Sequence, residues 1–438
     1  MIDTLKREIS RRGFVQASAI VSAALVLPSR LRAMPSPSSS GVIRVGVVGC
    51  GGRGTGAAVD CLRAAPGVEL VAMGDLFPDR LAQSRENLAK RAAENPEFAK
   101  QFKLTDERAF SGFDAIDKVL ASEIDLVLLA TPPGFRPAHL EKAIAAGKHV
   151  FMEKPVAVDV KGIRSVFASS DLAKSKGLAI VAGTQRRHDP GYRATIERLH
   201  AGAIGEIQSG EVYWNQGGLW NAKRQEGWTD TEWQIRNWLY FTWLSGDHIV
   251  EQHVHNIDVA NWVLRAHPIR AVGVGGRQRR TDPAYGHVYD HFAVQFEYAN
   301  GARVLSMCRQ IDGSANHIGE RFIGTKGWTI PAGEIEGARK WKYGTPEKPT
   351  SPYVLEHTNL IASIRDAKPL NEGRQVAESC LAAIMGREAA YTGQVVTWDD
   401  LLATPQDITP PTVAFGSMPV PPVAVPGTTK LLRAWNEA

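Results

Sequence analysis

The chain has 438 residues, of which 44% are hydrophobic and 22% are charged, so it is long enough to bury two sizeable cores. Its formal net charge is +5, but residues 1–40 carry +4 of this and the rest of the chain only +1. A near-neutral body lacks the basic surface that binds nucleic acid by charge, so we exclude nucleic acid as a partner.

Residues 1–40 are arranged like an export signal. Arg11 and Arg12 precede a moderately apolar run that ends at Leu27, and a Pro/Ser-rich spacer covers residues 35–40. The run is too short to span a bilayer as a stable helix, and its layout is typical of a secretory signal. The paired arginines resemble the twin-arginine type, whose route carries folded proteins. We therefore expect a periplasmic or otherwise exported protein without a stable membrane anchor; the alternative is a disordered basic arm.

A glycine-rich stretch after the first predicted strand organises the next domain. The apolar run 43–48 leads directly into Gly49-x-Gly51-x-x-Gly54, and helix-compatible small residues follow. Glycine lets the backbone turn sharply and approach a pyrophosphate, and the next helix points free N–H groups at the phosphates. The strand-to-helix context distinguishes this motif from an ordinary turn. The predicted dinucleotide-binding residues of the loop are Gly49, Gly51, Gly52, Arg53 and Gly54.

The cofactor preference rests on Asp75. It follows the second predicted strand, 68–73, and lies 21 positions after Gly54. A carboxylate there would hydrogen-bond the adenosine ribose and repel a 2′-phosphate, so NAD is predicted. Arg53 and Arg80 could neutralise a phosphate, which leaves NADP as an alternative, and Asp75 could also be an ordinary turn residue.

Later segments of the domain continue the alternation of strands and helices. Buried-strand patterns cover residues 125–130 and 148–152, and residues 178–184 are expected to return to the same sheet. This alternation predicts a doubly wound parallel sheet of the Rossmann type over residues 41–155. Further predicted cofactor contacts, at the ends of these strands, are Thr131, Pro132, Glu153 and Lys154.

Lys154 is also a candidate for catalysis. A lysine at the carboxyl end of a parallel strand lies over the crevice where such sheets bind ligands. Its ammonium could donate to a substrate hydroxyl and favour a developing alkoxide. The alternative is a solvated lysine at a domain junction.

These motifs, together with the run Ala146-Gly147-Lys148-His149-Val150-Phe151-Met152-Glu153-Lys154-Pro155, resemble the glucose–fructose oxidoreductase/inositol dehydrogenase family (Gfo/Idh/MocA) over roughly residues 41–400. The resemblance implies an NAD(P)-dependent oxidoreductase that acts on a sugar or polyol. It also implies a homo-oligomer, a dimer or tetramer, and no catalytic metal. In this family an acid four residues before a histidine accompanies the lysine, which corresponds here to Glu251 and His255, with Glu where Asp is usual.

The second domain is predicted over residues 156–393. Strand patterns cover 205–214, 269–274, 287–298 and 303–310, and Asn300-Gly301 is a strong hairpin signal. They predict an open, mainly antiparallel sheet with helices on one face, so the chain combines an α/β and an α+β domain. Residues 394–438 are rich in proline and are predicted to form an arm that wraps the body or a neighbour, or to be disordered.

The densest group of chemically useful side chains lies between residues 246 and 258. His248, Glu251, His255 and Asp258 are spaced 3, 4 and 3 apart, which places them on one face of a helix. His255, with a pKa suited to transfer near neutrality, would accept the hydroxyl proton, and Glu251 would orient it. A metal site from His248, Glu251 and His255, or a core role for His255, are the alternatives; we predict no metal.

Other side chains are weaker candidates. Predicted substrate contacts are Arg187, Tyr289 and His291. Six tryptophans between residues 214 and 243 could stack on sugar rings, although most are expected to pack an insertion. The four cysteines lack ligand spacing and are predicted to be small buried hydrophobes.

The predicted function is therefore an exported NAD(P)-dependent sugar or polyol oxidoreductase with a tightly held cofactor. One alternative is an NAD-dependent glycosidase that oxidises its sugar transiently and re-reduces it after elimination. A second is a sugar-binding protein without catalysis.

Overall fold

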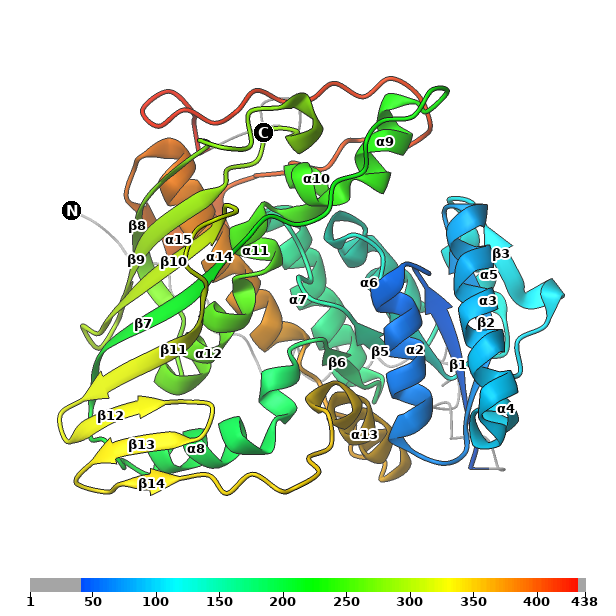
Figure 1. Cartoon of the computed structure of the whole chain (residues 1–438), viewed down its shortest axis with the longest axis horizontal. Coiled ribbons are helices and arrows are strands. Elements are labelled where there is room, and N and C mark those ends of the chain that lie inside the picture. Colours follow the sequence, from blue (N-terminus) through cyan, green and yellow to red (C-terminus); the bar gives the residue numbers. More distant parts are fainter. Residues whose placement is uncertain (1–40, 432–438) are drawn as a thin grey trace, which may run out of the picture. The chain divides into compact units, whose positions relative to one another are not determined.

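The computed structural model describes residues 41–431; the predicted signal segment and residues 432–438 lie outside the described residues. Within the described residues, the first sheet has six parallel strands in the order β3-β2-β1-β4-β5-β6 (Figure 1). Its strands are β1 (Ile43–Val48), β2 (Val68–Asp75), β3 (Ala109–Ser111), β4 (Leu126–Leu129), β5 (His149–Met152) and β6 (Ile180–Ala182). The order reverses between β1 and β4, and ligands bind such sheets at that point, outside the carboxyl ends of the strands.

Helices cover both faces of this sheet. One face packs against α2, α3 and α13, and the other against α5, α6 and α7. The helices are α2 (Gly52–Ala64), α3 (Pro78–Glu94), α4 (Pro96–Gln101), α5 (Ala115–Ala121), α6 (Arg136–Ala145), α7 (Val160–Ser175) and α13 (Pro352–Arg365). Because both faces are buried, the strands are almost continuously apolar, as predicted for a doubly wound sheet.

The second sheet is open and mainly antiparallel. Within the described residues its order is β14-β13-β12-β11-β7-β10-β9-β8-β15, and only β7 and β10 pair in parallel. Its strands are β7 (Ile207–Gln216), β8 (Pro268–Gly276), β9 (His291–Tyr298), β10 (Arg303–Gln310), β11 (His317–Gly324), β12 (Gly327–Ile330), β13 (Glu334–Gly337), β14 (Trp341–Lys342) and β15 (Val396–Thr397). The predicted hairpin at Asn300-Gly301 joins β9 to β10, and Gly301 has a φ of 82°. The predicted fold class is confirmed.

Helices of the C-terminal half cover one face of the second sheet. The central helix is α14, which packs against β8, β9 and the first-domain helix α7. The helices of this half are α8 (Pro190–His200), α9 (Asp230–Arg236), α10 (Thr242–Ser245), α11 (His248–Glu251), α12 (Val254–Leu264), α14 (Gly373–Thr392) and α15 (Trp398–Ala403). The opposite face of the sheet carries half-exposed side chains, since residues on β9 and β10 alternate between buried and accessible positions.

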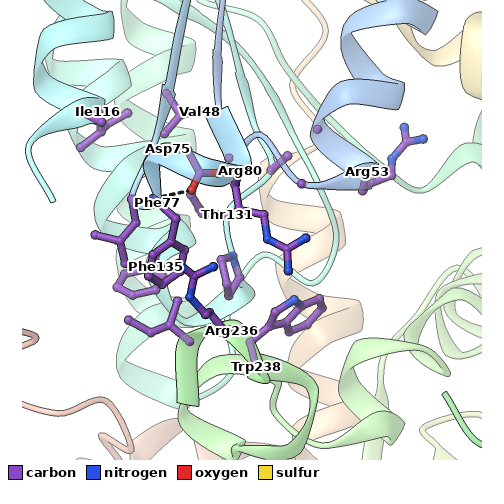
Figure 2. A pocket seen from close by; sticks show the side chains of 18 of the residues that line it. Val48, Arg53, Asp75, Phe77, Arg80, Ile116, Thr131, Phe135, Arg236 and Trp238 are labelled. Atoms are coloured by element: carbon purple, nitrogen blue, oxygen red, sulfur yellow. Dashed lines mark hydrogen bonds between the residues drawn. The ribbon is translucent and has the colours of Figure 1, made fainter. Parts of the chain in front are cut away.

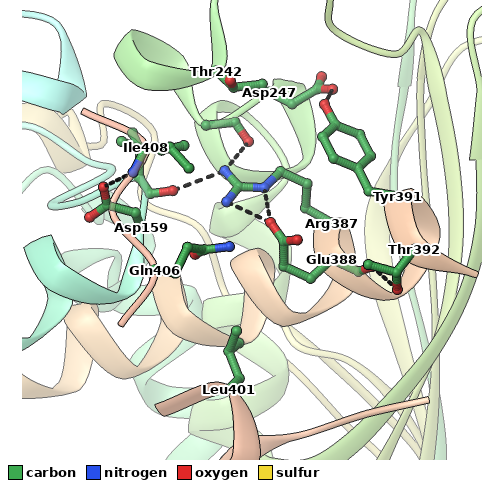
Figure 3. Close-up of polar contacts among 12 residues, drawn as sticks. Asp159, Thr242, Asp247, Arg387, Glu388, Tyr391, Thr392, Leu401, Gln406 and Ile408 are labelled. Carbon is green, nitrogen blue, oxygen red and sulfur yellow. Dashed lines mark hydrogen bonds and ion pairs between the residues drawn. The ribbon is translucent and has the colours of Figure 1, made fainter. Parts of the chain in front are cut away.

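A buried charged pair on α14 anchors two separate loops to this helix (Figure 3). Arg387 and Glu388 are fully buried, and their side chains are paired at 2.9 Å. Arg387 also donates to the carbonyls of Val158 and Gly246, at 2.9 and 3.1 Å. A buried guanidinium needs this number of acceptors, so the two loops that carry these carbonyls are held at one place on α14.

The Pro-rich C-terminal arm lies along the body as far as residue 431, in irregular conformation after α15. Near its start, the carboxylate of Asp159 accepts from the N–H of Ile408 at 3.0 Å. Further along, the Ala424 carbonyl accepts from the Tyr289 hydroxyl at 2.8 Å. No helix in residues 41–431 is long and apolar enough to cross a membrane. The four cysteines are free and buried, as predicted.

Candidate functional site

The glycine-rich loop is packed tightly against backbone atoms at Gly49 and Gly54, and is unobstructed at Gly51 and Gly52. Gly49 has a φ of 97°, and a Cβ on Gly54 would lie 1.8 Å from the Gly49 carbonyl oxygen, so both positions require glycine. A Cβ on Gly51 or Gly52 would meet nothing within 4 Å. Helix α2 begins here without a capping side chain or an acidic residue in its first turn. This cradle fits a pyrophosphate, because its N–H groups and open front are available to an anion.

A cavity of about 540 Å³ opens in front of this loop (Figure 2). Its walls come from the ends of the first-sheet strands and from the insertion 217–241 of the second domain. The predicted residues that line it are Gly49, Gly51, Gly52, Arg53, Gly54, Asp75, Thr131 and Pro132. The volume lies within the range of small-molecule and cofactor sites.

Asp75 is fixed at one end of the cavity. Its carboxylate accepts from the N–H of Cys50 at 2.6 Å and from that of Phe77 at 2.8 Å. Burial raises the pKa of Asp75, and these two hydrogen bonds oppose the shift. Each carboxylate oxygen keeps a further lone pair, so Asp75 can still accept from a ribose hydroxyl.

Two arginines lie at the same end. In Figure 2 the guanidinium of Arg80 lies between Asp75 and Trp238. Arg236, from α9, makes two 2.9 Å hydrogen bonds to Asp79 and lies 3.8 Å over the Phe77 ring. Arg236 was missed from the sequence because it enters the pocket from an insertion far along the chain.

Arg53 does not direct its charge at the front of the loop. Its guanidinium donates to Glu153 and lies 3.6 Å from both Asp60 and Glu356. It also lies 4.9 Å over the Tyr353 ring, and in Figure 2 it points away from Asp75. The predicted phosphate contact by this side chain is therefore not supported, because three carboxylates already surround its charge.

Glu153 and Lys154 do not line the cavity. Glu153 holds Arg53 and packs tightly against Gly183, where a Cβ would lie 2.5 Å from its Oε2. Lys154 instead contacts the second domain: its Nζ donates to the Glu251 carbonyl at 2.6 Å and to Glu251 Oε1 at 3.1 Å. The side chains of Lys154 and Glu251 are only 12% and 10% exposed, respectively. An ammonium has three donors, so one remains for another acceptor.

Arg136 links this cluster to the cavity. The Arg136 side chain is buried. Its guanidinium donates to the Pro155 carbonyl at 2.7 Å and to the Thr131 carbonyl. Thr131 lines the cavity, and Pro155 follows Lys154 in the chain. One side chain therefore sets the position of Lys154 relative to the cavity wall.

His255 lies against Trp214. The two rings are stacked at 5.6 Å, and His255 is 5% exposed. Burial, followed by the charges of Lys154 and Arg186, lowers the pKa of His255 well below 6.5. This corrects the predicted pKa near neutrality, because burial favours the neutral form of the ring.

The helix predicted over 248–258 is interrupted, and this separates the four polar residues that it would have aligned. Helix α11 ends at Glu251 and α12 begins at Val254. His248 contacts the Phe292 ring at 5.1 Å, so it is part of the core. Glu251 is paired with Lys154 and not, as predicted, with His255. Among residues 41–431, no group of three or more His, Cys, Asp or Glu side chains is placed to hold a metal ion.

The three predicted substrate contacts are corrected by the structure. Arg187 makes two 2.8 Å hydrogen bonds to Asp258 through Nε and Nη2, and its side chain is 12% exposed. Tyr289 is 2% exposed and belongs to the core. His291 pairs with Gly276 at the end of β9, next to buried Phe292, so it faces the opposite side of the second sheet from the helices.

A polar network centred on Glu320 lies next to His255, and the sequence did not predict it. Glu320, on β11, accepts from Arg186 at 2.5 Å, from Asn256 at 2.7 Å and from the Tyr192 hydroxyl at 3.0 Å. The Arg186 guanidinium also lies 5.6 Å over Trp214. Arg186 is next to the predicted Arg187 in the chain, but nothing local marks Glu320, whose place depends on strand register.

Comparison with known proteins agrees with this geometry. Residues 43–184 match the family described as "Oxidoreductase family, NAD-binding Rossmann fold", and residues 192–330 match the "GFO/IDH/MocA C-terminal domain". Inositol 2-dehydrogenase 3 of Saccharopolyspora erythraea is 31% identical over 60% of this chain and 65% of its own length. The 2,7-anhydro-N-acetylneuraminate hydratase of Escherichia coli is 25% identical over 49% of this chain and 53% of its own. The chain thus spans between about half and two thirds of these relatives.

Solved structures share the fold. The scyllo-inositol dehydrogenase of Lactobacillus casei, with bound NAD(H) and scyllo-inositol, superposes with a TM-score of 0.60 at 18% identity. The superposition covers 82% of this chain and 99% of that structure. At this identity the likeness concerns the fold alone.

Proposed function

Because the chain belongs to the Gfo/Idh/MocA family of oxidoreductases and carries its NAD-binding Rossmann domain, we propose that it is an NAD-dependent oxidoreductase of a sugar or polyol. The observation that carries the proposal is that Lys154, which pairs with Glu251 and lies near enough to His255 to lower its pKa, is linked to the cavity wall through Arg136, which binds the carbonyls of Pro155 and Thr131. Bound nicotinamide supplies the hydride acceptor or donor. The chain's own residues then bind the substrate oxygen and move its proton.

Each residue has a separate task in this proposal. The remaining N–H of Lys154 donates to the substrate oxygen and stabilises the negative charge that develops on it. Neutral His255 accepts the hydroxyl proton on a ring nitrogen. Glu251 holds the Lys154 ammonium through two acceptors, so its task concerns Lys154. Trp214, stacked on His255, limits the tilt of the imidazole.

The test uses purified, desalted protein. Its near-ultraviolet absorbance is recorded before and after addition of inositols, aldoses and glycosides, and a change at the reduced-nicotinamide band identifies substrates. Lys154→Ala and His255→Ala are expected to lower turnover by about 10²–10⁴-fold. Lys100→Ala, at an exposed lysine, is the matched control. Turnover within a few-fold of wild type in both variants would contradict the assignment.

A glycosidase of the same fold is the second candidate. The relative named as a hydratase favours it, since that name denotes addition of water without net oxidation. In this case the cofactor would return to its starting state in each cycle. Release of a chromogenic aglycone without net formation of NADH would replace the first proposal by this one.

We also propose export by the twin-arginine route with the cofactor already bound. Arg11 and Arg12 support this, and a folded passenger could retain a nucleotide that is not supplied outside the cytoplasm. Replacing both arginines by lysine is expected to retain the protein in the cytoplasm. Undiminished export of that variant would refute the route.

A further inference from the structure

The C-terminal arm reaches the cofactor cavity. After α15 it crosses the second domain and passes beside α9, where it is drawn in red at the top of Figure 1. Helix α9 contributes Ile235 and Arg236 to the cavity wall. The arm therefore lies directly behind one wall of the predicted nucleotide site.

Residues 416–418 of the arm are hydrogen-bonded to α9. The backbone N–H and the hydroxyl of Thr231 both donate to the Gly416 carbonyl at 3.2 Å. Gln234 Nε2 donates to the Met418 carbonyl at 2.8 Å, and the Met418 N–H donates to Asp230 at 3.2 Å. The Ser417 hydroxyl also donates to Asp230 at 3.3 Å, so five hydrogen bonds from three arm residues fix this segment to the helix.

Phe415, the residue before this attachment, contacts the first domain. Its ring lies 5.1 Å from that of Phe113 and 6.1 Å from that of Phe77. Both of those rings line the cavity, whereas Phe415 stands behind them. Phe113 and Phe415 are 41% and 49% exposed, so their mutual contact is not part of a deep core.

The contact lies at the adenosine end of the cavity. Phe77 follows Asp75 by two residues, and a carboxylate at the end of the second Rossmann strand bonds the adenosine ribose. The adenine ring beyond that ribose would therefore meet the face of Phe113, because Phe77 is buried and the Arg236 guanidinium lies 3.8 Å over its ring. The orientation of Phe113 decides how well adenine stacks.

We propose that residues 415–418 form a strap in which Phe415 positions Phe113 against adenine, so that the C-terminal arm retains the cofactor. The proposal rests on the proposed function, because it assumes an adenine dinucleotide in the cavity. The strap joins α9 of the second domain to the first domain behind the cavity wall that the adenosine would contact. Dissociation would then require the aromatic contact or the α9 attachment to open first.

The test compares ligand fragments on full-length, nucleotide-stripped protein. Phe415→Ala is expected to weaken ADP-ribose binding about three- to tenfold, the range of one aromatic pair, and to leave nicotinamide mononucleotide binding unchanged. NADH should dissociate faster by a similar factor, and Phe415→Tyr should restore wild-type values. A purely structural role would weaken both fragments equally.

Two further variants complete the design. Asp230→Ala removes the acceptor of the Met418 N–H, leaves Phe415 unchanged, and should also weaken ADP-ribose selectively; it tests the strap even if Phe415→Ala does not fold. Val420→Ala, at an exposed arm residue, is the matched control. ADP-ribose binding within twofold of wild type in both test variants would overturn the strap alone. Failure of the wild-type protein to bind NAD or ADP-ribose would overturn the proposed function as well.

Discussion

At the scale of single residues, the site depends on one charged pair that crosses the domain boundary. Lys154 ends the first domain and Glu251 ends α11, and their contact is shielded from water. A partly buried pair of this kind is strongly oriented, because each charge would lack compensation without the other. The same low exposure keeps neighbouring His255 neutral.

Glu251→Gln is predicted to lower kcat by about ten- to a hundredfold, because the amide keeps its size but loses the charge that holds the Lys154 ammonium. NAD affinity should not change, since Glu251 does not line the cavity. Steady-state kinetics and nucleotide titration measure the two effects. Glu206→Gln, at an exposed residue, is the control. An unchanged kcat would exclude a positioning role for Glu251.

The lowered pKa of His255 also predicts how the reaction rate depends on pH. Since the pKa of His255 is lowered, the base stays deprotonated as pH falls through 6.5. The rate of alcohol oxidation should therefore show no acid limb from His255 between about pH 8 and pH 6. The pH profile of kcat/KM in wild type and in His255→Gln measures this. A limb near 6.5 that is lost only in the variant would contradict the assigned environment.

At the scale of elements, the turn from β1 into α2 separates glycines with different tasks. Gly54 packs against the Gly49 carbonyl, whereas a Cβ on Gly56 would meet only the Arg53 guanidinium at 3.7 Å. The two positions lie on the same helix, so they form a matched pair. The loop requires glycine at position 54, whereas position 56 has room for a Cβ and helix propensity favours alanine there.

Gly54→Ala is predicted to abolish detectable NAD binding, because the added methyl would displace the loop carbonyl. Gly56→Ala should bind NAD as wild type does and gain roughly 0.5–1 kcal/mol in free energy of unfolding. Calorimetric titration and urea unfolding measure the two effects. Equal NAD affinity in both variants would mean that the loop does not hold the pyrophosphate.

At the scale of the whole molecule, the outer face of the second sheet carries unusual apolar surface. Val272 and Val274 on β8 and Leu305 on β10 are 49%, 68% and 38% exposed. Val272 and Leu305 lie in one row across the sheet, since both pair with Gln295 on β9. Val274 lies in the next row on the same face. Apolar patches of this kind mark protein contacts, and we expect a second copy of this chain to cover it.

Val274→Glu is accordingly predicted to shift the protein from a dimer or tetramer toward monomer, since a carboxylate in an apolar interface is costly. Light scattering on an exclusion column measures the mass. Leu172→Glu, at an exposed leucine of α7, is the control. A wild-type monomer at micromolar concentration would contradict the expectation.

The fold class and the glycine loop of the cofactor cradle could be predicted from the sequence, because each depends on residues close together in the chain. Apolar periodicity follows from which faces are buried, and the glycine spacing follows from local backbone geometry. The same reasoning failed for the helix over 248–258, where packing replaced the periodic pattern with a break at Gln252. It also failed for Arg187 and Tyr289, whose polar groups have partners in distant segments.

The sequence by itself thus determined the dinucleotide loop, the order of strands and helices, and the lysine at the end of β5. Only the tertiary structure decided which acid holds that lysine, a partner 97 positions away, and which segments complete the cavity. Arg236 and the C-terminal arm reach the adenosine end from the second half of the chain. Such partners are chosen by packing and strand register, which no local pattern encodes.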